Sequence, residues 1–266
     1  WLKADLAVVP RDKMVVICFH IPIINGGKLG DGTYRQEMLN LLDEFAESHI
    51  LSGHTHYMRN EPTLSGGMFE HVHAAVCGQW WWSNMNADGV PNGYGVYDIE
   101  GNTIKNWYYM GVNEGMNSRD YQMRLYRGDI KGGTSSKSFN TQLGHGVLLA
   151  NVFNADPAWK IEVYENGSLT GQMTLIPAKK YNADALGAYP CLVPTDSSQD
   201  WWSIGYHIGV VGRGKNSSYS NACYHMYKYT LKNPNCTDIR VEATDRFGRT
   251  YICDKVTADY DYALME

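Results

Sequence analysis

The sequences MVVICFH at Met14–His20 and ILSGHTH at Ile50–His56 decide how the first part of this chain folds. The first is continuously apolar and rich in β-branched residues up to Phe19, a pattern typical of a strand that is buried on both faces. Between the two stretches, apolar residues recur at the spacing of one helix face, at Met38, Leu41, Leu42 and Phe45. The order strand, glycine-rich loop, helix and strand predicts a βαβ unit with a parallel sheet.

Three histidines follow the two predicted strands. His20 comes directly after the first strand, and His54 and His56 come directly after the second. The carboxyl ends of parallel strands meet at one edge of a sheet, where open α/β proteins bind their ligands. Imidazole is the commonest metal ligand and binds zinc, iron, nickel or copper. A single histidine is more often a surface or hydrogen-bonded residue, so the hypothesis of a metal site depends on all three converging.

From about residue 68 onward the sequence predicts strands separated by turns. Runs typical of strands cover Phe69–Val76, Gly93–Ile99 and Thr103–Met110, and the last two are expected to form a hairpin. After a polar stretch, alternating runs such as Trp159–Tyr164 and Ile239–Ala243 indicate an all-β region of the β-sandwich kind. We therefore expect two domains, residues 1–115 and residues 116–266.

The composition is that of a globular protein. Of the 266 residues, 44% are hydrophobic and 19% are charged, and the formal net charge is −5. A negative net charge gives no electrostatic footprint for nucleic acid, so we expect no nucleic-acid partner. The sequence holds no apolar run long enough for a membrane-spanning helix. Because the net charge is negative, the negative charge of a phosphorylated substrate would have to be balanced locally, for instance by a metal ion.

The six cysteines contain no CxxC pair, which argues against a zinc ribbon or a thioredoxin-like redox motif. Four of them lie late in the chain, at Cys191, Cys223, Cys236 and Cys253. They permit disulfides if the protein leaves the cytoplasm, but they do not require them. Together with the aromatic- and Asn-rich β region, they favour an extracytoplasmic location, in the periplasm or at the cell surface.

Five stretches together resemble one known family. They are His20–Pro22, the GHTH sequence at Gly53–His56, CGQWWW at Cys77–Trp82, DGVPNGY at Asp88–Tyr94 and ATDRFG at Ala243–Gly248. The chain resembles the calcineurin-like metallophosphoesterases, specifically a bacterial subgroup with an added C-terminal β-domain. The resemblance implies an α+β fold: the C-terminal part of a calcineurin-like α/β/β/α phosphoesterase sandwich, followed by an all-β sandwich-like domain.

In that family, five sequence blocks bind two metal ions: Asp-x-His, Gly-Asp-x-x-Asp, Gly-Asn-His, a lone His and Gly-His-x-His. By position, the resemblance implies that His20 and His54 bind one divalent ion and that His56 binds the other. In the full-length enzyme these ions would be Mn, Fe or Zn. The first three blocks, which include the bridging aspartate and the general-acid histidine, have no counterpart upstream of His20. We therefore expect the C-terminal part of a longer enzyme, whose missing N-terminal half is its partner, with little activity by itself.

Three further residues are candidates for substrate contacts. Trp81 is a candidate for a stacking wall that faces a sugar or a lipid headgroup, and at least one of Trp80–Trp82 is expected in the core. Asn92 and Tyr94 lie in a glycine- and proline-rich turn and are expected to reach substrate, although a plain turn fits the same pattern.

Other aromatic residues and histidines are interpreted as structural. His71 and His73 share one face of a predicted strand, which places them near the expected site without making them ligands. Trp201 and Trp202 are expected in the core of the second domain, with a carbohydrate platform as the alternative.

Two functions from different classes fit these observations. The first is a metal-dependent phosphoesterase, in which a metal-activated water hydrolyses a phosphomono- or phosphodiester of a small phosphorylated substrate. The second is a non-catalytic module that binds a glycan, a lipid or a protein on a degenerate phosphoesterase platform. The upstream carboxylate blocks discriminate between them, because only the enzyme needs those blocks intact.

Overall fold

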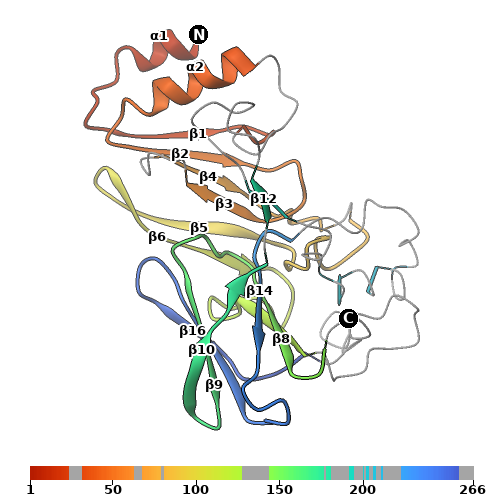
Figure 1. The fold of residues 1–266 in the computed structure, drawn as a ribbon. Helices are drawn as coiled ribbons and strands as arrows, with labels where there is room; N and C mark the ends of the chain where they lie inside the picture. The colour runs from red at the N-terminus through yellow and green to blue at the C-terminus, as the bar shows by residue number, and fades with distance from the viewer. Residues whose placement is uncertain are drawn as a thin grey trace.

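The computed structural model describes residues 1–23, 32–62, 68–78, 81–127, 144–176, 178–180, 192–194, 200, 202–203, 206–207, 211 and 223–257. The described chain is rich in β-structure, with two short helices near its beginning (Figure 1). The helices are α1 (Leu2–Leu6) and α2 (Gly32–Leu42).

A four-stranded sheet with the order β1-β2-β4-β3 forms the first layer. Its strands are β1 (Met14–Cys18), β2 (Glu47–Ser52), β3 (Arg59–Pro62) and β4 (Met68–Val72). β1 runs parallel to β2, and β2 runs parallel to β4, whereas β3 is antiparallel to β4. Both helices lie on one face of this sheet (Figure 1), where Leu6, Leu39 and Ile50 share an apolar core. The predicted βαβ unit is confirmed.

The expectation that Met14–Phe19 is buried on both faces is wrong. Val15 and Ile17 pack against the core under the helices, but Val16 is 37% exposed and Cys18 is also exposed. Successive side chains of a strand point to opposite faces. The second face of β1 is only partly covered, by the contact of Met14 with the cluster of Phe69, Ile104 and Trp107. β1 lies at the end of the sheet order, which explains why apolar residues alone did not predict its burial.

A hairpin covers the other face of the first sheet. It consists of β5 (Gly93–Glu100) and β6 (Thr103–Gly111), paired antiparallel from Gly93 opposite Gly111 to Glu100 opposite Thr103. Phe69 of β4 packs with Ile104 and Trp107 of β6. Figure 1 shows this hairpin between the first sheet and the later β-strands. The hairpin was predicted correctly.

The later strands form two four-stranded sheets around one core. One sheet has the order β11-β14-β8-β7 and contains β7 (Met123–Arg127), β8 (Val147–Val152), β11 (Thr174–Leu175) and β14 (Met226–Thr230). The other has the order β10-β9-β15-β16 and contains β9 (Lys160–Glu165), β10 (Ser168–Gln172), β15 (Ile239–Thr244) and β16 (Thr250–Cys253). A small pair consists of β12 (Ala178–Lys180) and β13 (Leu192–Pro194).

The core between these two sheets joins residues far apart in sequence. Leu125 and Ala150 come from one sheet, and Val163 and Val241 come from the other. The described part of this region is therefore β-rich, as predicted. The division at residue 115 and the complete α/β/β/α sandwich stay predictions.

Arg246 links the first sheet to the later strands β7–β16, which are called the β-region below. Its guanidinium forms two hydrogen bonds with the Asp156 carboxylate, at 2.8 and 2.9 Å. The same guanidinium lies over the rings of Phe69, at 4.3 Å, and Trp107, at 5.0 Å. Charge pairing and stacking on aromatic rings suit the planar guanidinium. The Asp-Arg-Phe-Gly turn that contains Arg246 therefore has a structural role where the β-region contacts the first sheet.

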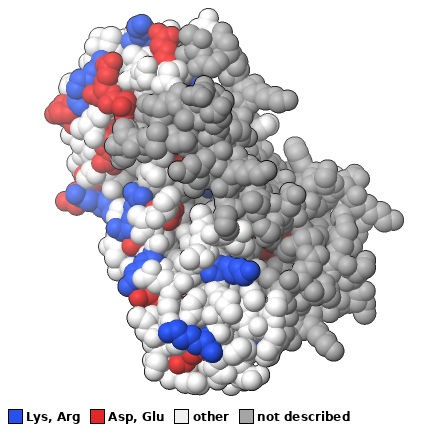
Figure 2. All heavy atoms as spheres, in the orientation of Figure 1, with Lys and Arg blue, Asp and Glu red and all other residues white. Residues whose placement is uncertain are grey.

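Several smaller expectations can be checked against the fold. Trp202 is buried in a core cluster, as expected, whereas Trp201 lies outside the described residues. The described cysteines are free thiols, and Cys191 lies outside the described residues. No helix within the described ranges is long and apolar enough to span a membrane. Lys and Arg are interspersed with Asp and Glu over the described part of the face in Figure 2.

Candidate functional site

The loops that follow β1 and β2 meet at the carboxyl edge of the first sheet. The Phe19 amide donates to the carbonyl oxygen of Leu51 at 3.1 Å, and the Gly53 amide donates to the carbonyl oxygen of His20 at 3.0 Å. These two bonds continue the parallel pairing of β1 and β2 beyond the strands. The two loops are therefore held side by side.

His20 and His54 face each other on this edge. His54 Nδ1 lies 3.0 Å from His20 Nε2, and the two rings meet edge to face with centroids 4.9 Å apart. Both side chains are exposed. The sequence prediction that these two histidines lie close together is thus matched by the geometry.

His56 is oriented by a third loop. His56 Nδ1 lies 2.8 Å from the carbonyl oxygen of Gly78, to which it donates. This bond places the imidazole lone pair on Nε2, and metal-binding histidines commonly donate their other ring N–H to a backbone carbonyl in this way. Gly78 has φ +52°, and a Cβ atom there would overlap Asn92 Oδ1 and lie 2.5 Å from the Ser83 carbonyl oxygen. Only glycine fits the position that orients His56.

Backbone strain is concentrated at this edge. Among the described residues, the non-glycine residues with positive φ are His54 at 67°, His56 at 54°, Trp81 at 65° and Asn166 at 49°. Three of these four belong to the candidate site, and the fourth is in a hairpin turn. Such conformations cost about 1–3 kcal/mol each and persist only where the surrounding structure over-determines them. Two of these residues, His54 and His56, lie in the GHTH loop.

His20 and His54 present two imidazole nitrogens at nearly the spacing of two ligands of one ion. Two imidazole nitrogens bound to one tetrahedral zinc ion lie about 3.4 Å apart, given Zn–N bonds near 2.05 Å. The His20–His54 separation of 3.0 Å is close to that value. Within the described ranges, no group of three or more His, Cys, Asp or Glu side chains is placed to hold an ion. The described residues therefore show two facing imidazole nitrogens but no complete set of ligands for an ion.

Exposed aromatic rings lie on the loop that orients His56. Trp81 is 79% exposed and Trp82 is 48% exposed, so neither indole is in the core. Trp80 lies outside the described residues, which leaves the expectation of a core tryptophan among Trp80–Trp82 as a prediction. Tyr94 is half exposed, at the start of β5.

Asn92, in contrast, is part of the framework. It is only 7% exposed, and its side-chain amide donates to the carbonyl oxygen of Ser83 at 2.8 Å. Its backbone carbonyl accepts the amide of Val112, also at 2.8 Å. In this structure Asn92 joins the loop at 83–92 to the end of the hairpin, so the expected contact between Asn92 and substrate stays a prediction that the burial disfavours.

A chain of buried polar side chains crosses the other face of the first sheet. His49 Nε2 lies 2.8 Å from Glu47 Oε1, and His49 Nδ1 lies 3.0 Å from His71 Nε2. His71 Nδ1 lies 2.9 Å from Asn60 Oδ1, and Asn60 donates to the backbone carbonyl of Asn154 at 2.9 Å. Both ring nitrogens of His71 are thus used within the protein, in agreement with its structural interpretation.

The pKa values in this chain follow from burial and hydrogen bonding. Burial lowers the pKa of His71 well below its usual range, and it lowers the pKa of His49 against the opposing effect of Glu47. Burial alone would raise the pKa of Glu47. Hydrogen bonds from the Ile104 amide, the Thr103 hydroxyl and His49 outweigh burial and lower that pKa.

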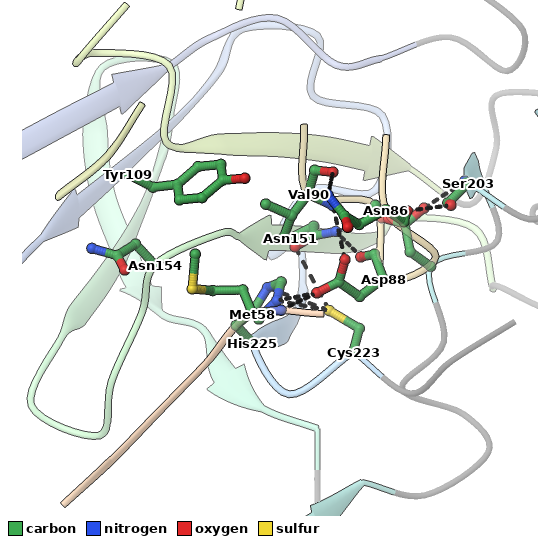
Figure 3. Close-up of polar contacts among 12 residues, drawn as sticks. Met58, Asn86, Asp88, Val90, Tyr109, Asn151, Asn154, Ser203, Cys223 and His225 are labelled. Atoms are coloured by element: carbon green, nitrogen blue, oxygen red, sulfur yellow. Dashed lines mark hydrogen bonds and ion pairs between the residues drawn. The ribbon is translucent and has the colours of Figure 1, made fainter. Parts of the chain in front are cut away.

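A second polar network is buried where the loop at 83–92 meets the β-region (Figure 3). Asp88 Oδ2 accepts the Met58 amide at 2.7 Å and lies 3.2 Å from His225 Nε2. Asp88 Oδ1 accepts the Val90 amide at 3.1 Å, and the Asp88 backbone carbonyl accepts the Asn151 side chain at 2.8 Å. A fully buried carboxylate with these partners fastens three separate segments together.

This network resembles a nucleophilic triad in its geometry but not in its environment. Cys223 Sγ lies 3.4 Å from His225 Nδ1, and His225 continues to Asp88, as Figure 3 shows. All three side chains are buried, and burial raises the pKa of the Cys223 thiol well above its usual range. A reactive cysteine needs a lowered pKa and access to solvent. The three residues are therefore structural.

His207 connects the same loop to a helical segment near residue 203. His207 Nδ1 donates to the carbonyl oxygen of Ser203 at 2.8 Å, and His207 Nε2 lies 2.8 Å from Ser83 Oγ. Burial lowers the pKa of His207 to about 4. Neither this histidine nor the Asp88 network was predicted from the sequence, because the contacts His207–Ser83 and His225–Asp88 join residues 124 and 137 positions apart.

Comparison with known proteins gives one family match. The family model described as the C terminal of calcineurin-like phosphoesterase matches residues 70–251. The matched segment covers most of the chain, and it begins after His20, His54 and His56. No significant match was found among curated proteins or among solved structures.

Proposed function

This chain belongs to the calcineurin-like phosphoesterase family, and on that premise we propose that it carries part of a metal-dependent phosphoesterase site. The observation that carries the proposal is the approach of His20 Nε2 to His54 Nδ1, 3.0 Å apart at the carboxyl edge of a parallel sheet. His20 and His54 would bind one divalent ion, and His56 would bind a second ion. The strained backbone at His54 and His56 supports a functional role for this loop.

When bound, a pair of divalent ions supplies a hydroxide near neutral pH and clamps the attacking and leaving oxygens of the phosphate ester. In this chain His20 and His54 supply neutral nitrogen donors from adjacent loops. The bond from His56 to the Gly78 carbonyl holds the third imidazole in its metal-binding form. Neutral histidines bring no negative charge, so the carboxylates that hold two ions together have to come from outside the described residues. We expect weak metal binding and negligible turnover by this chain alone.

The substrate would be a small phosphorylated molecule. Trp81 would stack on its organic part, because the Trp81 indole is exposed on the loop that orients His56. Tyr94 is exposed at the start of β5 and is a second candidate contact. We further propose an extracytoplasmic location, on the sequence composition alone.

Metal titration tests this proposal directly. The chain is titrated with Zn²⁺ or Mn²⁺ in a calorimeter, alongside His20→Ala, His54→Ala and His56→Ala variants. His145→Ala is the matched control, because His145 is an exposed histidine that contacts Asn235 in the β-region. We expect each site variant to weaken binding and the control to bind like the wild type. Equal binding by all variants would show that the three histidines are not ligands.

A phosphodiester hydrolysis assay completes this test. We expect metal-dependent hydrolysis by the isolated chain to stay near background. Efficient turnover would contradict the interpretation of an incomplete site. The exposed indoles of Trp81 and Trp82 also favour the second candidate, a binding module for a glycan or lipid. That function gains if the histidine variants leave metal binding unchanged while Trp81→Ala abolishes ligand binding.

A further inference from the structure

Glu70, in the middle of β4, contacts both loops that carry the facing histidines. Its side chain is fully buried. Glu70 Oε1 accepts the backbone amide of Ile23 at 2.8 Å and the Ser52 hydroxyl at 3.1 Å. Ile23 follows His20 on one loop, and Ser52 ends β2 just before the other loop. One carboxylate oxygen therefore joins the two polypeptide segments that present His20 and His54.

We propose that Glu70 is a positioning residue of the candidate metal site, which sets the separation between His20 and His54. The expected effect of Glu70 on metal binding rests on the proposed function, whereas its link between the two loops does not. The structural part stands on the two hydrogen bonds to Glu70 and on the direct bond from the Gly53 amide to the His20 carbonyl.

The chemistry of a carboxylate suits this role. A carboxyl oxygen has two lone pairs, so one oxygen can accept an amide and a hydroxyl at once. The Ile23 amide is buried, so removal of its acceptor would leave a donor without compensation. Glu70 is itself rigidly placed, because β4 pairs with β2 on one side and β3 on the other, with Glu70 opposite Ile50 and Glu61.

Metal affinity is sensitive to this kind of support. Groups that orient ligands typically change affinity by about 10–100-fold when they are removed. His20 and His54 are exposed, and the described residues show their loops linked through Glu70 and through Gly53. Without Glu70, the loop after His20 loses its anchor at Ile23, and the facing pair of imidazoles is no longer preformed.

The experiment compares Glu70→Ala, Glu70→Gln and Ser52→Ala in the full chain. Glu165→Ala is the matched control, because Glu165 is also a buried glutamate that accepts two backbone amides, from Lys232 and Asn233, at 2.8 Å each. Glu165 lies in the β-region, so its loss should affect stability without affecting the histidines. Co²⁺ is the probe, because its visible absorption reports both affinity and ligand geometry.

We expect Glu70→Ala to weaken Co²⁺ binding by about tenfold or more and to change the absorption spectrum. Glu70→Gln keeps an acceptor oxygen and should restore most of the affinity, and Ser52→Ala should give a smaller loss. The Glu165→Ala control should bind Co²⁺ like the wild type. Wild-type affinity in Glu70→Ala, or an equal loss in the control, would overturn the proposal. If Glu70→Ala does not fold, Ser52→Ala decides, because unchanged binding in that variant would count against the anchor.

A metal-free measurement separates this proposal from the proposed function. Hydrogen exchange at the Gly53 and Ile23 amides reports whether the two loops stay fastened. We expect faster exchange at both amides in Glu70→Ala and no change in Glu165→Ala. If the wild type binds no Co²⁺, the proposed function fails, and the exchange result alone decides whether Glu70 holds the loops. Unchanged exchange would refute the positioning role.

Discussion

His207 should make the folded protein less stable as the solution becomes acidic. The side chain is fully buried, and burial lowers its pKa from 6.5 to about 4. Below pH 6.5 the unfolded chain takes up a proton at this histidine, whereas the folded protein does not take it up until about pH 4. The contribution of His207 to stability is therefore complete above pH 6.5 and is lost as the pH falls toward 4. At pH 5 the linkage relation gives a loss of about 2 kcal/mol relative to pH 8.

The assay is urea unfolding at pH 8 and pH 5, followed by tryptophan fluorescence, for the wild type and for His207→Gln. Glutamine keeps a polar amide, with both donor and acceptor groups, near the Ser203 carbonyl and Ser83 Oγ. The wild type should lose about 2 kcal/mol more than the variant between the two pH values. Contributions of other buried histidines, such as His71, cancel in this difference. An identical loss in both proteins would refute the reasoning, and His145→Gln, at an exposed histidine, should behave like the wild type.

Two further predictions concern the loop that orients His56. Gly78→Ala should destabilise the protein by about 1–3 kcal/mol and weaken Zn²⁺ binding, because the new Cβ would overlap Asn92 and displace the carbonyl that holds His56. Urea unfolding and calorimetry measure the two effects. Gly101→Ala is the control for strain alone, since Gly101 has φ +60° with nothing within 4 Å of a Cβ; metal binding lost equally in that variant would contradict the prediction. Trp81→Ala should change stability by less than about 0.5 kcal/mol, because the side chain is exposed, yet weaken the binding of an aryl phosphate. Trp1→Ala, at another exposed indole, should leave that binding unchanged, and unchanged binding in Trp81→Ala would remove this residue from the site.

Local patterns in the sequence were enough for much of the fold. The alternation in Ile239–Ala243 reflects which face of that strand is covered, because strand side chains alternate between the two faces. The continuous apolar run after Met14 predicted the strand itself. The hairpin of β5 and β6 was predictable because its turn joins two strands adjacent in the chain. The exposure of Val16 was not predictable, because it depends on what lies beside β1 in the sheet.

Some features of the candidate site could likewise be predicted from the sequence, and others could not. The pairing of β1 with β2 brings His20 to His54, so topology inferred from sequence was sufficient to place them together. Asn92 lies in a turn of the kind that often carries specificity, and its side-chain NH2 group donates to the Ser83 carbonyl inside the protein. No local pattern distinguishes an asparagine that faces substrate from one that faces a neighbouring carbonyl.

The βαβ unit, the β-rich later region, the family and the approach of His20 to His54 could all be inferred from the amino-acid sequence. Each follows from short-range periodicity or from motifs whose residues are close in the chain. Three features became visible only in the folded protein: the hydrogen bonds of Glu70 to Ile23 and Ser52, the bonds of Asp88 to separate segments, and the burial of His207, which lowers its pKa. Those roles depend on which atoms meet after long loops close, and on the water that is excluded when they do.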